Sequence, residues 1–263
     1  MREATECILC GTDPPLTDEH VWPRWYRRLL NDKTFEYRSD VPGKHSLRRT
    51  VMGLAVRARV LCGLCNNEWG KRLEDDVRPT LEPMVKGERV AISVPAAIML
   101  STWVMLKTAV LEYLVDEDQR PNTIFSRDQL HYLRRKGRPA GPVFVWTGWY
   151  EGSEYNIARH HDQPKRVRFG EDKIDAYIST LSIGQAVFQL FAVQGHGDRK
   201  PDWLDPVDPN GTWAGVMPQI WPLPEGPFLW PTYREGFTDE HFEILAKRWD
   251  SDQPAQLILV RRA

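Results

Sequence analysis

The chain has 263 residues, 41% of them hydrophobic and 27% charged, with a formal net charge of −1. This is ordinary globular composition, sufficient for one large domain or two smaller ones. The near-neutral charge gives no whole-molecule field that would attract nucleic acid. The longest uncharged run, residues 91–106, is short for a membrane span and contains Pro95. The N-terminus carries charges where a secretory signal would be apolar, so we expect a soluble, cytoplasmic protein with no membrane partner.

All four cysteines fall in two C-x-x-C motifs, Cys7–Cys10 and Cys62–Cys65. Tetrahedral Zn²⁺ takes four soft ligands, and each such turn presents two thiolates. A redox C-x-x-C would be expected once, after a strand, and disulfides are unusual in the cytosol. The pattern therefore predicts a structural zinc ion that clamps the intervening residues 11–61.

Three polar residues accompany these motifs: Glu19 and His20 lie between them, and Asn66 directly follows the last cysteine. A carboxylate and an amide carbonyl are hard oxygen ligands that suit Mg²⁺ or Mn²⁺. His20 would then take a proton from a water aimed at a phosphodiester, while the metal neutralises the leaving oxygen. An isolated Glu-His pair is usually an ordinary surface pair, but its position between the two cysteine motifs favours a catalytic interpretation.

The order C-x-x-C, Glu19-His20-x-x-Pro23, then Cys62-x-x-Cys65-Asn66 resembles the HNH (ββα-metal) endonucleases whose finger is held by four cysteines. Phage resolvases of the endonuclease VII type place asparagine in the same way. The resemblance covers about residues 5–76. It implies that Glu19 and Asn66 hold the catalytic Mg²⁺ or Mn²⁺, that His20 is the general base, and that the partner is DNA, which we expect to be double-stranded.

This chain differs from the family pattern at three positions. Arg57 stands where many HNH enzymes have an asparagine, and Gly70 where some have histidine or asparagine. Glu19 is one methylene longer than the more common aspartate. Basic residues cluster around this segment, and although most such runs are solvated faces, we expect nucleic-acid contacts from Arg24, Arg27, Arg28, Arg48, Arg49, Arg57 and Arg59.

The expected fold class is α+β, with a small zinc-stabilised ββα-metal head over residues 1–86 and a larger α+β domain over residues 87–263. The sheet of the second domain should be mostly antiparallel. The apolar run predicts a buried helix at 96–115, and Ser126-x-x-Gln129 is a capping-box signature that opens another helix. The other expected elements are helices at 23–30, 63–74 and 238–249, a hairpin over 46–61 turning near Gly53, and strands at 142–150, 165–169, 176–184, 186–194 and 255–262.

Three functions are compatible with these features. The first is a metal-dependent DNA endonuclease, of the kind found in restriction or phage defence, whose second domain selects substrate, forms a homodimer or regulates. The second is a non-catalytic zinc-containing nucleic-acid-binding protein. The third is a ligand-sensing module with a decayed HNH head. Intact Glu19, His20 and Asn66 favour the first, and the near-neutral charge favours the third.

Overall fold

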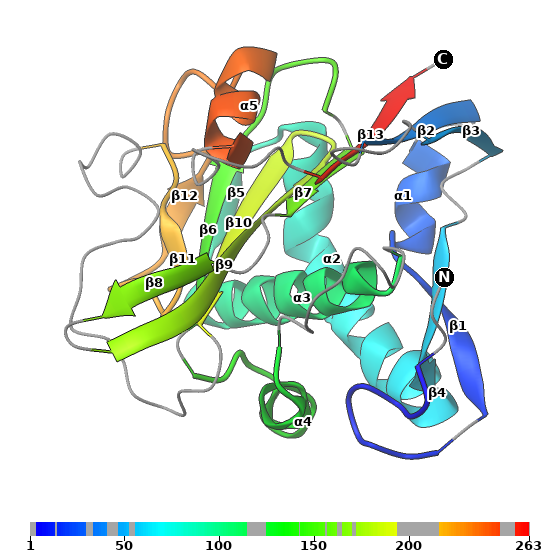
Figure 1. The fold of residues 1–263 in the computed structure, drawn as a ribbon. Helices are drawn as coiled ribbons and strands as arrows, with labels where there is room; N and C mark the ends of the chain where they lie inside the picture. The colour runs from blue at the N-terminus through cyan, green and yellow to red at the C-terminus, as the bar shows by residue number, and fades with distance from the viewer. Residues whose placement is uncertain are drawn as a thin grey trace.

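The structure is a computed structural model (Figure 1). The described residues are 4–13, 15–29, 34–40, 47–52, 56–114, 125–141, 143–155, 157–161, 165–169, 172–193, 216–247 and 256–262.

A two-stranded antiparallel sheet leads directly into a long helix near the N-terminus. Strand β1 (Leu16–His20) pairs with β4 (Arg57–Cys62), which places His20 opposite Arg57. After β4 the chain enters a π-helical segment, η1 (Leu64–Gly70), that continues as helix α2 (Lys71–Lys86). The predicted helix at 63–74 is thus confirmed, and it extends further than expected. The short helix α1 (Arg24–Leu29) follows β1.

The predicted hairpin over residues 46–61 is wrong. Strand β3 (Leu47–Met52) pairs with β2 (Thr34–Asp40), whereas β4 pairs with β1, so the two segments belong to different sheets. The alternation of apolar residues and arginine indicated strands correctly, but it carries no information about the partner strand. The expected turn near Gly53 lies outside the described residues.

A larger antiparallel sheet of nine strands confirms the α+β class and the predicted strand positions. Its order is β11-β6-β10-β9-β7-β13-β2-β3, with β8 paired to β9. The hairpin of β9 and β10 turns at Gly184, whose φ of 57° suits glycine. The remaining bounds are β6 (Val143–Trp149), β7 (Ile157–His161), β8 (Lys165–Phe169), β9 (Asp172–Ile183), β10 (Ala186–Val193), β11 (Gln219–Trp221) and β13 (Gln256–Arg262). A separate pair joins β5 (Val90–Ile92) to β12 (Phe228–Trp230).

Helix α3 (Val94–Glu112) is the predicted buried helix and lies along the sheet against α2, β10 and β11 (Figure 1). Ser93 caps its N-terminus by accepting a hydrogen bond from the Ala96 amide at 3.3 Å. By length and composition α3 could cross a membrane, but 78% of its most apolar window is buried inside the structure. Ser126 and Gln129 form the predicted capping box of α4 (Arg127–Lys136), and α5 (Asp239–Lys247) packs near β7 and β9.

One buried cluster crosses the predicted domain boundary. It joins Leu61 and Val77 of the N-terminal part to Leu106 and Phe188 of the remainder. The structure therefore gives both segments a shared core, while the division at residue 86 stays a prediction.

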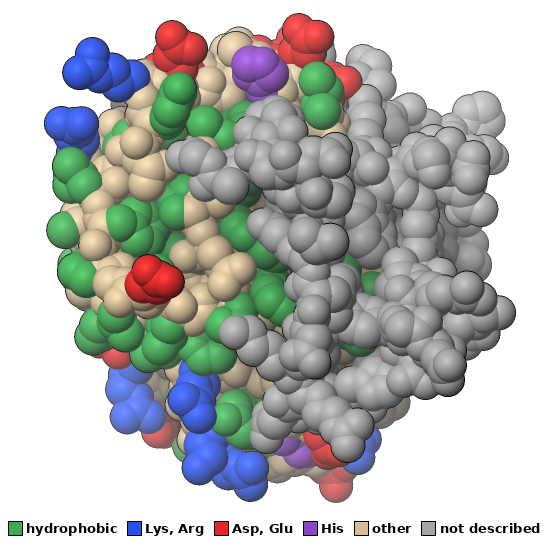
Figure 2. Space-filling view, turned by 90° about the vertical axis from the view of Figure 1, so that its left-hand side faces the viewer, with side chains coloured by type: hydrophobic (Ala, Val, Ile, Leu, Met, Phe, Trp, Pro, Cys, Tyr) green, Lys and Arg blue, Asp and Glu red, His purple; other side chains and the backbone are tan. Residues whose placement is uncertain are grey.

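Figure 2 views the side of the molecule away from β1 and β4, where the visible Lys and Arg side chains occupy the margins of the described surface. No basic side chains gather over the middle of that described surface.

Candidate functional site

The four predicted zinc ligands come together between the N-terminal turn and the β4–η1 junction. The sulfur atoms of Cys7, Cys10, Cys62 and Cys65 all lie within 4.8 Å of one another. The Cys10 and Cys62 Sγ atoms are 3.6 Å apart. A tetrahedral zinc site with Zn–S bonds of about 2.3 Å needs sulfur separations of about 3.8 Å. The cluster is therefore a possible metal site, compatible with structural zinc as the sequence predicted.

Backbone geometry shapes the first turn. The Gly11 amide donates to the Cys7 carbonyl at 2.8 Å, and the Cys7 amide donates to the Thr12 carbonyl at 2.9 Å. Gly11 has φ of 71°, a conformation that side-chain-bearing residues rarely adopt. The Ile8 amide donates to the Val60 carbonyl at 3.1 Å, which fixes this turn beside β4.

The pKa of Cys7 is lowered within the cluster, whereas those of Cys62 and Cys65 are raised. Hydrogen bonding from the Cys65 thiol lowers the pKa of Cys7 to about 4. The same bond, together with burial, raises the pKa of Cys65. Because the thiolate is the form that binds metal, Cys7 is prepared as a ligand.

Helix α4 supplies a positive charge next to the cysteines. The Arg134 guanidinium lies 5.5 Å from the centre of the Trp69 ring, and its proximity partly opposes the rise in the pKa of Cys65. A β-carbon placed on Gly11 would lie 3.4 Å from His131 Cε1, so α4 also lies close to the first cysteine turn. Four thiolates around a divalent ion carry net negative charge, which Arg134 offsets. Sequence reasoning did not connect the basic end of α4 with the cysteines.

Strand β1 directs alternate side chains to two different environments. Asp18 is half-exposed and pairs with Arg57 at 3.8 Å and Arg59 at 3.3 Å. Asp18 was not singled out from the sequence, although the period of two along β1 would have placed it on the same side as His20. His20, opposite Arg57, is partly exposed. One side of β1 and β4 therefore presents a histidine, a carboxylate and two guanidinium groups.

Asn66 links the start of the helix to β1. Its Nδ2 donates to Thr17 Oγ1 at 2.8 Å and to the Asp18 carbonyl at 3.3 Å. Thr17 Oγ1 in turn donates to the Leu61 carbonyl of β4 at 3.0 Å. With Nδ2 directed at the strand, the amide oxygen Oδ1 is the end of Asn66 that can hold a cation. The structure thus brings Asn66 to the strand that ends at His20.

Glu19 meets a residue that the sequence did not connect with the site. Lys107, fully buried on α3, donates from Nζ to Glu19 Oε1 at 2.6 Å, Glu74 Oε1 at 2.8 Å and the His20 carbonyl at 2.9 Å. Burial alone would lower the pKa of Lys107, but the charges of Glu19 and Glu74 outweigh it and raise the pKa above its usual range. The ammonium therefore stays charged at any ordinary pH.

The predicted Mg²⁺ ligands fit a divalent cation only in part. Asn66 retains Oδ1, but one oxygen of Glu19 is bound by Lys107, and the Glu19 side chain is only 9% exposed. The hydrogen bond from Lys107 goes to Oε1 of Glu19 and not to Oε2. A cation held by both residues would need Glu19 Oε2 and Asn66 Oδ1 to converge, with waters filling the rest of its coordination, as Mg²⁺ commonly requires.

The predicted nucleic-acid contacts are described only in part. Arg24 and Arg28 are exposed on α1, and Arg57 and Arg59 are about half-exposed on β4. The strand register places Arg57 opposite His20 and Arg59 opposite Asp18. The side chains of the other predicted contacts lie outside the described residues: Arg27, Arg48 and Arg49.

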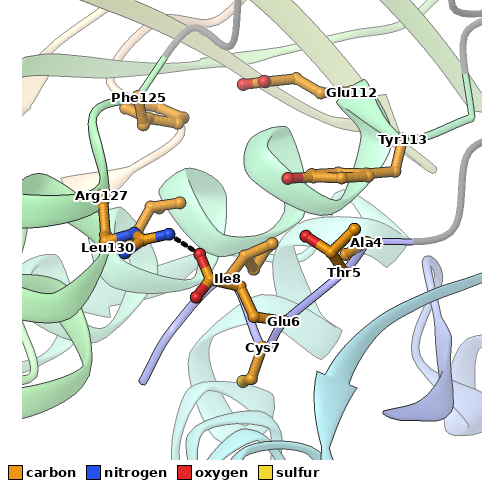
Figure 3. A pocket seen from close by; sticks show the side chains of 10 residues that line it. All are labelled: Ala4, Thr5, Glu6, Cys7, Ile8, Glu112, Tyr113, Phe125, Arg127 and Leu130. Carbon is orange, nitrogen blue, oxygen red and sulfur yellow. Dashed lines mark ion pairs between the residues drawn. The ribbon is translucent and has the colours of Figure 1, made fainter. Parts of the chain in front are cut away.

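A cavity of about 290 Å³ lies beside the cysteine cluster, between the N-terminal turn, the end of α3 and α4 (Figure 3). An ion pair between Arg127 and Glu6 closes one side of it. Glu112, Tyr113 and Phe125 also line it. The cavity contains Cys7 in its wall, and it is separate from the surface around His20.

Comparison with known proteins adds no relative. No family model, curated protein or solved structure matches the chain. Any assignment of function therefore depends on the residues and geometry described above.

Proposed function

We propose that the protein is a metal-dependent endonuclease of the HNH type that hydrolyses DNA phosphodiester bonds. One observation carries the proposal: Asn66, at the start of the helix after β4, hydrogen-bonds β1 through its side chain. Strand β1 ends at His20 and pairs with β4. A strand pair followed by a helix, with four cysteines at its base, is the arrangement expected of a ββα-metal head. In this proposal Zn²⁺ is structural and holds the N-terminal turn against the β4–η1 junction.

The chain's own residues account for each chemical task. Partly exposed His20 accepts the proton of the attacking water. Asn66 Oδ1 and Glu19 Oε2 hold Mg²⁺ or Mn²⁺, which, when bound, neutralises charge on the phosphate and the leaving oxygen. Arg57 and Arg59, held in place by Asp18, contact the phosphate backbone.

The partner in this proposal is double-stranded DNA. Exposed arginines on α1 and β4 supply phosphate contacts close to His20, although the net charge of the whole chain is −1. Binding should therefore be local and should weaken as salt rises. We extend the proposal to a role in restriction or phage defence in the cytoplasm. The remainder of the chain would then select the substrate, form a homodimer or regulate cleavage.

Cleavage of supercoiled plasmid by the zinc-loaded full chain tests the proposal. Wild type and Asn66→Ala are compared in Mg²⁺, in Mn²⁺ and in EDTA, with Asn67→Ala as a matched control because Asn67 is exposed and adjacent. Nicking that needs the divalent ion, survives in Asn67→Ala and falls at least tenfold in Asn66→Ala supports the proposal. Cleavage that is unchanged in EDTA or in Asn66→Ala contradicts it.

One observation favours a second candidate, a non-catalytic zinc-containing nucleic-acid-binding protein. Lys107 already neutralises the Glu19 carboxylate that a catalytic metal would use. In that case DNA binding depends on salt but is indifferent to Mg²⁺, and no substrate is cut. A gel-shift titration with and without Mg²⁺, run beside the plasmid assay, separates the two candidates.

A further inference from the structure

Lys107 contacts Glu19 of the proposed cation site, although Lys107 lies outside the predicted head. It comes from α3, which follows the predicted boundary at residue 86, and has no exposed surface. All three protons of its ammonium have an acceptor, in Glu19, Glu74 and the carbonyl of His20. Two of these acceptors are consecutive residues, so the lysine fixes the end of β1.

The charges of this cluster do not balance. One ammonium faces two carboxylates, and the Glu74 side chain is 23% exposed whereas that of Glu19 is 9% exposed. Counted alone, this cluster keeps one negative charge for the proposed cation, whereas Asp18, Arg57 and Arg59 on the exposed side of the same strands add one net positive charge. The same ammonium competes with that cation, because it occupies an oxygen of Glu19 that a metal would otherwise take.

We propose that Lys107 is a built-in counter-cation that limits the affinity of the Glu19–Asn66 site for divalent ions. It acts as a positioning residue: it holds the Glu19 carboxylate and the His20 backbone in place and leaves Glu19 only one oxygen for the metal. The inference rests on the proposed function in placing the catalytic ion between Glu19 and Asn66. It adds that the ion is held weakly and is exchanged readily with solvent.

The test is Mn²⁺ binding to the zinc-loaded full chain without DNA, followed by electron paramagnetic resonance of the free ion. Lys107→Met removes the charge at similar volume and should bind Mn²⁺ at least tenfold more tightly than wild type. The double variant Lys107→Met/Glu19→Gln should lose that gain. Lys71→Met serves as the control, because Lys71 is an exposed lysine paired with Asp75 on α2 and its removal changes net charge equally.

Thermal unfolding provides a second readout for a poorly stable Lys107→Met. Mn²⁺ should raise the Tm of this variant more than that of wild type, because an ion that binds only the folded state stabilises it. Unchanged or weaker Mn²⁺ binding, a gain that survives Glu19→Gln, or a variant that Mn²⁺ does not stabilise each overturns the inference. Because no DNA is present, these results are separate from the plasmid assay: an inactive protein with the expected Mn²⁺ pattern would refute the nuclease and retain the role of Lys107.

Discussion

Lys107 and Glu19 form a buried ion pair, with 2.6 Å between Nζ and Oε1, that joins helix α3 to the strand carrying His20. Glu74 of α2 completes the cluster at 2.8 Å from the same nitrogen. Three elements thus meet at one ammonium group. The predicted nuclease head and the helix beyond it are connected by charge as well as by the shared apolar core.

Loss of the ammonium should destabilise the fold. Lys107→Met leaves two carboxylates without their buried partner, and we expect a loss of about 3–5 kcal/mol in the free energy of unfolding. Urea denaturation of the zinc-loaded protein measures it. The neutral triple variant Lys107→Met/Glu19→Gln/Glu74→Gln should recover much of the loss, since no charge is then left unpaired. Equal stability of wild type and Lys107→Met would contradict the importance of the pair.

The cysteine cluster predicts one tightly bound zinc per chain. Cys62→Ser should lose the ion and unfold the N-terminal part, because the binding energy of a structural zinc is also folding energy. Metal analysis after dialysis, with circular dichroism, provides the readout. Asn67→Ala, next to the second motif but exposed, should keep both zinc and fold. A stable Cys62→Ser protein without metal would show that the cysteines are not a structural clamp.

Arg134 should strengthen zinc binding without being a ligand. Its guanidinium lies close enough to Cys65 to favour the thiolate, so Arg134→Gln should weaken zinc affinity about 10–100-fold. Competition with a chromophoric chelator measures the change. Arg135→Gln removes the same charge from the exposed neighbouring position and should have little effect. Equal losses in both variants would indicate only a general effect of net charge.

The raised pKa of Tyr150 predicts that the protein loses stability in alkali. Burial and its hydrogen bond with Asp239 raise the pKa of Tyr150 in the folded state. The contribution of Tyr150 to the free energy of unfolding is therefore complete at pH values below about 10, the pKa of tyrosine in the unfolded chain, and it declines as the pH rises above that value. The difference in unfolding free energy between wild type and Tyr150→Phe should shrink from pH 9 to pH 11. Exposed Tyr233→Phe is the control. A constant difference would contradict the assignment.

Local signals predicted much of this structure. The apolar run gave α3, Ser126 and Gln129 gave the start of α4, and Gly184 marked the turn between β9 and β10. Each of these depends on neighbours in sequence: a periodic apolar face, a cap or a positive φ. The cysteine spacing likewise located a cluster that the structure brings together.

Long-range partners could not be read from the same signals. The alternation in residues 46–61 indicated strands but could not show that β3 pairs with β2. Lys107 lies within the predicted helix at 96–115, but the sequence did not show that Glu19 and Glu74, distant in sequence, neutralise it inside the core. Asp18 was passed over beside Glu19, although strand alternation separates their environments.

The most direct test of the central claim is nicking of supercoiled plasmid by zinc-loaded wild type and His20→Ala in Mn²⁺. DNA binding and zinc content are measured on the same samples. The account predicts that His20→Ala retains zinc and DNA binding but cuts at least a hundredfold more slowly, within the range expected for loss of a general base. Equal cutting by the two proteins would contradict the assignment of His20 as the base.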